Sequence, residues 1–353
     1  MTSDPPRLRT PCDLQRRQIL SNESSSKLTK NERRAAAREQ ARVAREAEKK
    51  REKRNRLFIQ GGVVLGVVAV LAIVGLVLTQ SLKPAGPGPE NMASGGAIFG
   101  EDLKVIPGDR LEDPAAQRIF PEVDRESVPL DVSVYVDYMC PACGNFEQQN
   151  GVMLENYVGS GDITLRVYPI NFLDGQSLGT KYSTRAANLF ACVVEQQPDF
   201  AFALHTRLLS AEVQPSEGTT GLDDKQLIQE AVAAGAEATT ALQSCVRDRS
   251  FAGFINENNT WAMTDIVGLA EGEQLIETMD AQGNPISFQN ADEPQRLVST
   301  PLVIVNGKQW NAARDGSLES YILKVKGEIE QTSAGTDTAT DEDADSAAKE
   351  ESE

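Results

Sequence analysis

Two cysteines, Cys140 and Cys143, lie two residues apart in the run YMCPACG. A pair with this spacing occurs in redox couples, in halves of metal sites and in structural disulfides. The run follows PLDVSVYVD (129–137), a β-branched and mostly apolar segment typical of a buried strand, and it opens a helical pattern over 140–158. A CxxC that directly follows a buried strand and begins a helix favours the redox interpretation.

The position of Cys140 at the first turn of a helix predicts a low thiol pKa. Unpaired backbone N–H groups and the positive end of the helix dipole both stabilise a thiolate there. Cys140 is therefore the expected attacking sulfur, and Cys143, three residues later on the same side, is the expected shielded resolving sulfur. Pro141 suits the first turn, because its missing N–H costs no hydrogen bond there.

The metal interpretation needs further ligands. Structural zinc sites usually repeat the cysteine pair or add a pair of histidines. Here Cys192 and Cys245 are isolated in the sequence, and the single histidine, His205, lies within a helical pattern. We expect no metal site, and we expect His205 to be a packed or partly exposed helix residue.

Other residues near the pair have alternative interpretations. Asp137 and Glu147 flank it, and each either tunes Cys140, accepts a proton from Cys143 or is simply solvated. Tyr138, Met139 and Phe146 either offer an apolar surface to unfolded substrate or, for Phe146, belong to the core.

An uncharged stretch at 57–82, LFIQGGVVLGVVAVLAIVGLVLTQSL, divides the chain. About 20 apolar residues cross a bilayer core, and the 56 residues before this stretch are too many for a cleaved signal peptide. Residues 1–56 hold 17 Lys and Arg against 8 Asp and Glu, which predicts that this end is cytoplasmic. We therefore predict a single-pass protein of the plasma membrane, with 57–82 as an uncleaved signal anchor and residues 83–353 outside the cytoplasm.

The charge distribution supports the same division. The net charge is +9 for residues 1–56 and −17 for the whole chain, which leaves −26 for the rest. The basic segment 28–56 is plausible as a helix but has no apolar stripe, so we expect a solvated helix and no nucleic-acid partner. The acidic end, 328–353, cannot bury a core and is expected to be disordered.

The remaining pattern predicts an α/β fold. Strands are expected at 129–137, 163–168 and 301–306, with a hairpin at Asn306-Gly307 and a final helix at 317–329. Helical patterns fill 180–197, 198–211, 223–235 and 237–249, and a further segment spans 250–272. Residues 83–124 are predicted to be a tether with a short edge strand or hairpin at 95–106. The sheet is thus expected to be split by an all-helical insertion over about 180–290.

The run DVSVYVDYMCPACGNFEQ, followed by RVYPINFLDGQS, a helical insertion and STPLVIVNGK, resembles the DsbA-type branch of the thioredoxin superfamily over residues 125–327. The resemblance implies a thioredoxin-like fold, Cys140 as the attacking sulfur and Cys143 as the resolving one. It also implies a cis-proline at Pro301, preceded by Thr300, beside the sulfurs, where an extended substrate backbone binds. No cofactor is expected.

This sequence departs from the family at two places. The strongest oxidants of the family have histidine between the cysteines, whereas this chain has Ala142 after Pro141, which predicts a milder oxidant. The stretch 268–297 is longer than the family's usual approach to the cis-proline, and it is either a specificity loop or a tolerated surface insertion.

Cys192 and Cys245 both lie in helical patterns of the insertion. Four cysteines fall in the predicted extracytoplasmic part, an even number, where disulfides persist. Their placement resembles that in DsbA-like proteins with a stapled insertion, so the resemblance implies a structural disulfide. Two buried free thiols, or a relay role, are the alternatives.

The expected function is an extracytoplasmic thiol:disulfide oxidoreductase that introduces disulfide bonds into exported proteins at Cys140–Cys143. Its partners would be unfolded exported proteins and a membrane redox partner that reoxidises the pair. Two alternatives remain open at this point, namely a thiol reductase or isomerase and a tethered, non-catalytic thioredoxin-fold binding module.

Overall fold

The computed structural model describes residues 34–35, 38–39, 41–46, 49–50, 86–121, 123–127, 129–280, 282, 285–288 and 294–331. The chain divides into two units, Met1–Lys83 and Pro84–Glu353. The described residues of the first unit are helical and exposed. The predicted span at 57–82 and the tail from residue 332 lie outside the described residues. Within the part that is described, no helix is long and apolar enough to cross a membrane.

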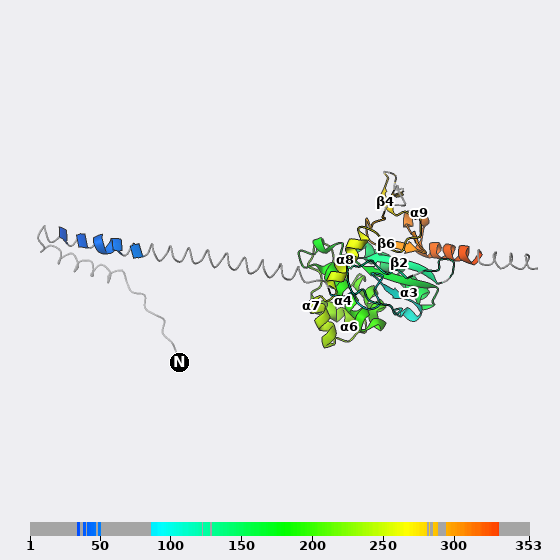
Figure 1. Cartoon of the computed structure of the whole chain (residues 1–353), viewed down its shortest axis with the longest axis horizontal. Helices are drawn as coiled ribbons and strands as arrows, with labels where there is room; N and C mark the ends of the chain where they lie inside the picture. The colour runs from blue at the N-terminus through cyan, green and yellow to red at the C-terminus, as the bar shows by residue number, and fades with distance from the viewer. Residues whose placement is uncertain are drawn as a thin grey trace, which may run out of the picture. The chain divides into compact units, whose positions relative to one another are not determined.

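A five-stranded mixed sheet forms the centre of the second unit (Figure 1). Its order is β1 (Ala97–Phe99), β3 (Ile163–Pro169), β2 (Leu130–Val136), β6 (Leu302–Val305) and β7 (Lys308–Gln309). β2 and β3 run parallel, whereas the other neighbours pair antiparallel. The parallel pair is joined by α3 (Pro141–Gly159), so the predicted strand–helix–strand unit is present.

Both faces of the sheet are covered, which explains the nearly continuous apolar run of β2. All seven residues of β2 are buried, as expected for a strand between two layers. Val132 and Val134 contribute to the larger core with α3 and α4 (Tyr182–Gln196), whereas Tyr135 contributes to a smaller core on the other face. On that second face Arg166 and Asp131 form a buried ion pair.

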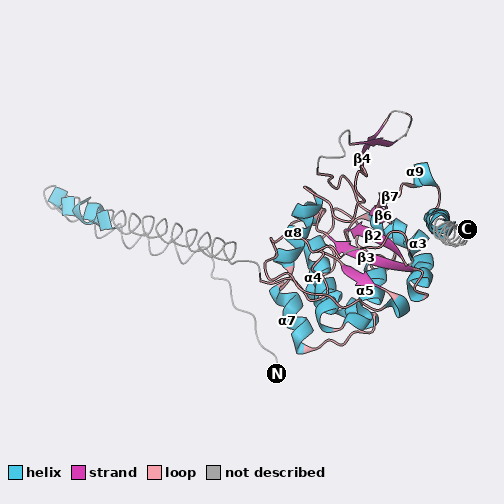
Figure 2. Ribbon diagram, turned by 45° about the vertical axis from the view of Figure 1, so that its right-hand side comes forward, coloured by secondary structure: helices cyan, strands magenta, loops and turns pink. Residues whose placement is uncertain are grey.

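The helical insertion lies between β3 and β6 (Figure 2). Asp223 and Thr239 cap two of its helices by accepting backbone N–H groups of the first turn. The helices end at residue 262, so the predicted insertion is helical only in its first part. Its helices are α4 (Tyr182–Gln196), α5 (Ala201–Leu208), α6 (Asp224–Ala233), α7 (Thr240–Asp248) and α8 (Ala252–Ala262).

The stretch 263–300 contains a two-stranded sheet in place of helix. Strand β4 (Ile276–Met279) pairs antiparallel with β5 (Pro285–Ser287), and Figures 1 and 2 show this pair projecting from the body of the domain. Its Met279 and Ile286 side chains are exposed, so the pair buries few apolar groups. The extra length of 268–297 is therefore located in a surface feature.

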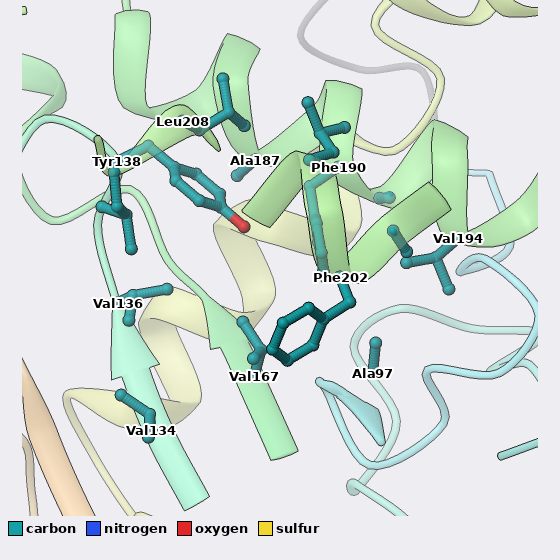
Figure 3. Packing of buried hydrophobic residues seen from close by; sticks show 14 of the residues in the cluster. Ala97, Val134, Val136, Tyr138, Val167, Ala187, Phe190, Val194, Phe202 and Leu208 are labelled. Atoms are coloured by element: carbon teal, nitrogen blue, oxygen red, sulfur yellow. The ribbon is translucent and has the colours of Figure 1, made fainter. Parts of the chain in front are cut away.

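The core joins the insertion to the sheet. Figure 3 shows Phe190 and Phe202, from α4 and α5, beside Val134 and Val167 of the sheet, with Tyr138 among them. Tyr138 is fully buried, so the chain segment just before the CxxC is anchored in this core. Its aromatic ring also lies near Phe190, with centroids 6.1 Å apart.

The segment before residue 125 belongs partly to the folded domain. Met92 and Phe99 are fully buried in the main core, and β1 pairs with β3 at the sheet edge. The domain therefore begins near Gly88, whose N–H donates to Leu111 O at 2.7 Å. The physical reason is that an unpaired edge of β3 would expose backbone donors and acceptors.

The chain after β6 closes the sheet as predicted. Asn306 and Gly307 both have positive φ, 50° and 85°, which is typical of a two-residue hairpin turn. A short helix, α9 (Ala312–Asp315), and a helix over 318–331 follow. Leu318 and Ile322 of the latter are buried in the main core.

Candidate active site

Cys140 lies at the N-cap of α3, directly after the turn that follows β2. Its φ and ψ are extended, and Pro141 occupies the first helical turn. The Cys140 N–H donates to Asp137 O at 3.0 Å, and the N–H groups of Cys143 and Gly144 donate back to Cys140 O at 3.0 and 3.2 Å. The local sequence thus forms the turn-then-helix geometry that the spacing predicted.

The two cysteines are free thiols with different access to solvent. Cys140 is 8% exposed and Cys143 is fully buried. Pro141 and Ala142, between them, are exposed. A reaction partner can therefore reach only the small exposed part of Cys140, whereas Cys143 is inaccessible.

The surroundings shift the two thiol pKa values in opposite directions. The pKa of Cys140 is lowered to about 6, chiefly by the hydrogen bond from the Cys143 side chain, with smaller contributions from Thr300 and the N–H groups of Cys143 and Ala142. Burial opposes this lowering but does not outweigh it. Burial raises the pKa of Cys143 well above its usual value. Cys140 is therefore the thiolate at neutral pH, and Cys143 stays protonated.

The loop before β6 brings Thr300 and Pro301 to the sulfurs. The Thr300–Pro301 peptide bond is cis, and Cys140 Sγ lies 3.5 Å from Thr300 O, within hydrogen-bond range for a thiol donor. The Thr300 side chain favours the thiolate instead, so Thr300 contacts Cys140 in either protonation state. The predicted neighbours of the pair, 160 residues away in sequence, are thus adjacent to it in space.

Asp137 ties the CxxC turn to two other elements. Its carboxylate accepts hydrogen bonds from Met139 N at 2.8 Å, Leu173 N at 2.8 Å and Ser183 Oγ at 2.7 Å. Burial raises its pKa to about 7 despite these three donors, and the charge of Cys140 raises it further. Asp137 is therefore buried, not solvated, and its charge is coupled to that of Cys140.

Glu147 and His205 lie behind the pair. The nearest polar atoms of Glu147 and His205 are 3.7 Å apart, and His205 Nδ1 lies 3.2 Å from Tyr138 Oη. Burial lowers the pKa of His205, with Glu147 opposing this shift. His205 is a packed residue, as expected, and Glu147 is buried beside it rather than solvated.

The apolar residues around the pair belong to the core. Tyr138 and Met139 are fully buried, and Phe146 is 8% exposed and packs near Trp310, with ring centroids 6.2 Å apart. None of the three is available as a substrate-binding surface. The hypothesis of an apolar surface at these residues is wrong, because all three are buried in the domain.

Cys192 and Cys245 form a disulfide between α4 and α7. The S–S distance is 2.00 Å, and the bond closes a loop of 53 residues. Cys192 is fully buried and Cys245 is 6% exposed. The bond lies within the helical insertion and joins two helices that are separate in sequence.

The sequence interpretation missed Gln214, whose side chain reaches the CxxC turn from the loop after α5. Its Nε2 donates to Cys140 O at 2.9 Å and lies 3.4 Å from Tyr138 O. The signal in the sequence was Gly144, because glycine early in a helix is unfavourable unless something approaches closely.

The described residues hold no cluster of three or more His, Cys, Asp or Glu side chains suited to a metal ion.

Comparison with known proteins agrees with this architecture. The sequence model of a family described as thioredoxin matches residues 125–268. Serine/threonine-protein kinase PknE of Mycobacterium tuberculosis H37Rv is 28% identical over 151 residues, and the same match is found in the PknE of Mycobacterium bovis. This match covers 42% of the present chain and 26% of the kinase, so it spans about a quarter of these curated relatives.

Several solved structures are similar at lower identity. The reduced disulfide bond oxidoreductase DsbG of Mycobacterium tuberculosis is 21% identical, with a TM-score of 0.43 and coverage of 68% of this chain and 92% of that one. Oxidised DsbA of the same organism is 21% identical, with a TM-score of 0.44 and coverage of 68% of this chain and 98% of that one. Oxidised BdbD of Bacillus subtilis is 16% identical, with a TM-score of 0.43 and coverage of 70% of this chain and 100% of that one.

The family match covers the CxxC together with its strand–helix–strand unit. The match also spans the helices α4 to α8, whereas the antiparallel β6–β7 pair lies beyond it. The family model described as thioredoxin thus matches the part of the chain that carries Cys140 and Cys143.

Proposed function

We propose that this protein is a thiol:disulfide oxidoreductase that introduces disulfide bonds into exported proteins through Cys140 and Cys143. The observation that carries the proposal is the opposite shift of the two thiols. Cys140 has a pKa of about 6 at a helix start beside Thr300–Pro301, whereas Cys143 is buried with a raised pKa.

The proposed reaction begins with the Cys140–Cys143 disulfide. A substrate thiolate attacks Cys140 Sγ, the Cys140–Cys143 bond breaks, and Cys143 leaves and takes up a proton. A second substrate thiolate then attacks the substrate sulfur of the mixed disulfide and releases Cys140 as a thiolate. The substrate dithiol has lost two electrons, and the Cys140–Cys143 pair has gained them.

The low pKa of Cys140 favours this direction. A thiolate that is stabilised in the reduced protein is a good leaving group, and stabilising the reduced form makes the disulfide a stronger oxidant. The hydrogen bond from Cys143 and the N–H groups of the helix start supply that stabilisation. Ala142, in place of a cationic side chain, adds no charge of its own.

The proposed location is the outer side of the plasma membrane, with residues 57–82 as the anchor. The support is the uncharged length of this segment and the basic residues before it. The disulfide between Cys192 and Cys245 agrees with an oxidising compartment. In this setting the substrates are newly exported proteins, and a membrane redox partner reoxidises the pair.

The test is the reduction potential of Cys140–Cys143 in the full-length chain, equilibrated with glutathione buffers in detergent and quantified by mass spectrometry of the alkylated peptide. A potential of about −120 to −180 mV is expected for a disulfide donor. A potential of about −230 mV or lower would contradict the donor direction and favour a reductase.

A further inference from the structure

The side chain of Gln214 lies over the first turn of α3, although it comes from the helical insertion. Its Nε2 donates to Cys140 O at 2.9 Å and faces Tyr138 O at 3.4 Å. Both acceptors are backbone carbonyls of the active-site turn, one of them that of Cys140 itself. One amide group therefore connects the insertion to the chain on both sides of Met139.

Gln214 is itself held in place by its own loop. Its N–H donates to Ser210 O at 2.9 Å, and the neighbouring Val213 is 8% exposed and packs in the main core. The side chain thus projects from an anchored piece of backbone.

Gly144 makes the room that this side chain needs. A Cβ placed at Gly144 would lie 2.0 Å from Gln214 Oε1 and 2.9 Å from its Cδ. The three atoms nearest to that position all belong to the Gln214 side chain. Glycine in a helix is less favourable than alanine, so its presence directly after the CxxC is explained by the approach of Gln214.

We propose that Gln214 is a positioning residue that sets the thiol pKa and the redox potential of Cys140, and that Gly144 serves to admit it. The inference rests on the proposed role of Cys140 as the reactive sulfur. Gln214 fixes the carbonyl of Cys140, and with it the turn whose Cys143 and Ala142 N–H groups stabilise the thiolate. The positive end of the Gln214 amide also faces this turn, which favours negative charge there.

The test is a double-mutant cycle on the full-length chain, with Gln214→Ala, Gly144→Ala and both together. The rate of Cys140 alkylation is followed against pH by mass spectrometry, and the redox equilibrium with glutathione is measured in parallel. Each single variant is expected to raise the pKa of Cys140 by about half a unit, about threefold in the thiolate-to-thiol ratio, as for loss of one neutral hydrogen bond. The double variant is expected to change no more than either single one, because both remove the same contact.

Thermal unfolding supplies a second readout, because the change in Tm caused by Gly144→Ala should have opposite signs with and without the Gln214 side chain. Gly144→Ala in the wild-type background displaces the Gln214 side chain and is expected to lower Tm. In the Gln214→Ala background the three atoms nearest to the added Cβ are gone, and the same change is expected to raise Tm, because alanine favours the helix. Gly159→Ala, also in α3, is the matched control, since its Cβ would only meet Leu103 at 3.9 Å, and its effect should be equal in both backgrounds.

Unchanged Cys140 pKa and potential in both single variants, with only Tm altered, would overturn the inference. Additive shifts in the double variant would overturn it as well. A failure of the proposed function is distinguishable, because it is seen in the wild-type chain alone as a reduction potential in the range of a reductase.

Discussion

The two cysteine pairs of the domain differ in their spacing and in where they lie in their helices. Cys140 and Cys143 lie within one helix start, two residues apart, as free thiols. Cys192 and Cys245 lie inside two different helices and form a bond across 53 residues. Exposure does not separate the pairs, because Cys140 is 8% exposed and Cys245 is 6% exposed, while Cys143 and Cys192 are fully buried.

The difference shows that position in the helix, not the presence of two cysteines, decides what a pair does. Unpaired backbone N–H groups at the start of a helix stabilise the thiolate of a cysteine located there. In the middle of a helix the backbone N–H groups already donate to backbone carbonyls, so a cysteine there gains no such stabilisation. The first arrangement suits exchange, and the second suits a permanent crosslink.

The largest expected effect comes from removing the reactive sulfur. Cys140→Ser should abolish insulin reduction by the full-length chain, because no other described thiol lies at the surface of the site. Cys143→Ser should instead accumulate a mixed disulfide with substrate, since the resolving thiol is lost. Both are measured by turbidity and non-reducing electrophoresis. Activity retained in Cys140→Ser would support the alternative of a non-catalytic binding module with a structural CxxC.

Replacing the second pair should change the stability of the domain and leave thiol–disulfide exchange at Cys140 unaffected. Replacing both Cys192 and Cys245 by alanine should lower the free energy of unfolding by about 4 kcal/mol, as the chain-entropy estimate gives for a loop of this length. Denaturant unfolding measures this loss. The alkylation pKa of Cys140 should stay at its wild-type value, and a shift of that pKa would show that the two pairs are coupled.

The pH dependence of the first pair should reflect the lowered pKa of Cys140. Its alkylation rate should rise with pH and level off above about 6, where an ordinary thiol would still be increasing. Because the folded pKa is depressed, the reduced form gains stability as pH rises from about 6 toward the ordinary value. Unfolding of the reduced and oxidised forms across this range checks the sign, and the Cys192–Cys245 pair, which does not titrate, should contribute nothing.

Asp137 should have the smallest effect on the exchange chemistry. Its folded pKa of about 7 lies above that of an unfolded aspartate, so its contribution to stability is present at low pH and is lost as pH rises toward 7. Asp137→Asn should remove this dependence and lower the pKa of Cys140 slightly, because one nearby negative charge is gone. Unfolding curves at several pH values and the alkylation profile measure the two effects. An unchanged pH dependence of stability would show that Asp137 is not the titrating group.

Much of the fold followed from local patterns. The mostly apolar β2, the helix after Cys140 and the Asn306-Gly307 turn each have a local sequence pattern that predicts them. The edge strand expected within 95–106 is present as β1. The earlier start of the domain depends on contacts far away in sequence, since Met92 packs in the main core. The described residues of 263–300 are not helical, although they follow helices.

The candidate site was predictable only where its parts are close in sequence. The spacing of the cysteines and the strand before them predicted Cys140, Pro141 and Cys143 as site residues. The interpretation of Asp137 and Glu147 stayed open, because burial is a tertiary property that spacing cannot give. Thr300 and Pro301 were placed by family resemblance, not by any local signal.

The sequence by itself determined which sulfur sits at a helix start, because backbone N–H groups at that position are unpaired in any helix. Only the tertiary structure decided how strongly that sulfur is stabilised. It brought Thr300 to the Cys140 sulfur, buried Asp137 against Ser183 and Leu173, and set Gln214 over Gly144. These contacts join segments from 36 to 160 residues apart, and electrostatic interaction depends on distance in space and on the exclusion of water, not on separation along the chain.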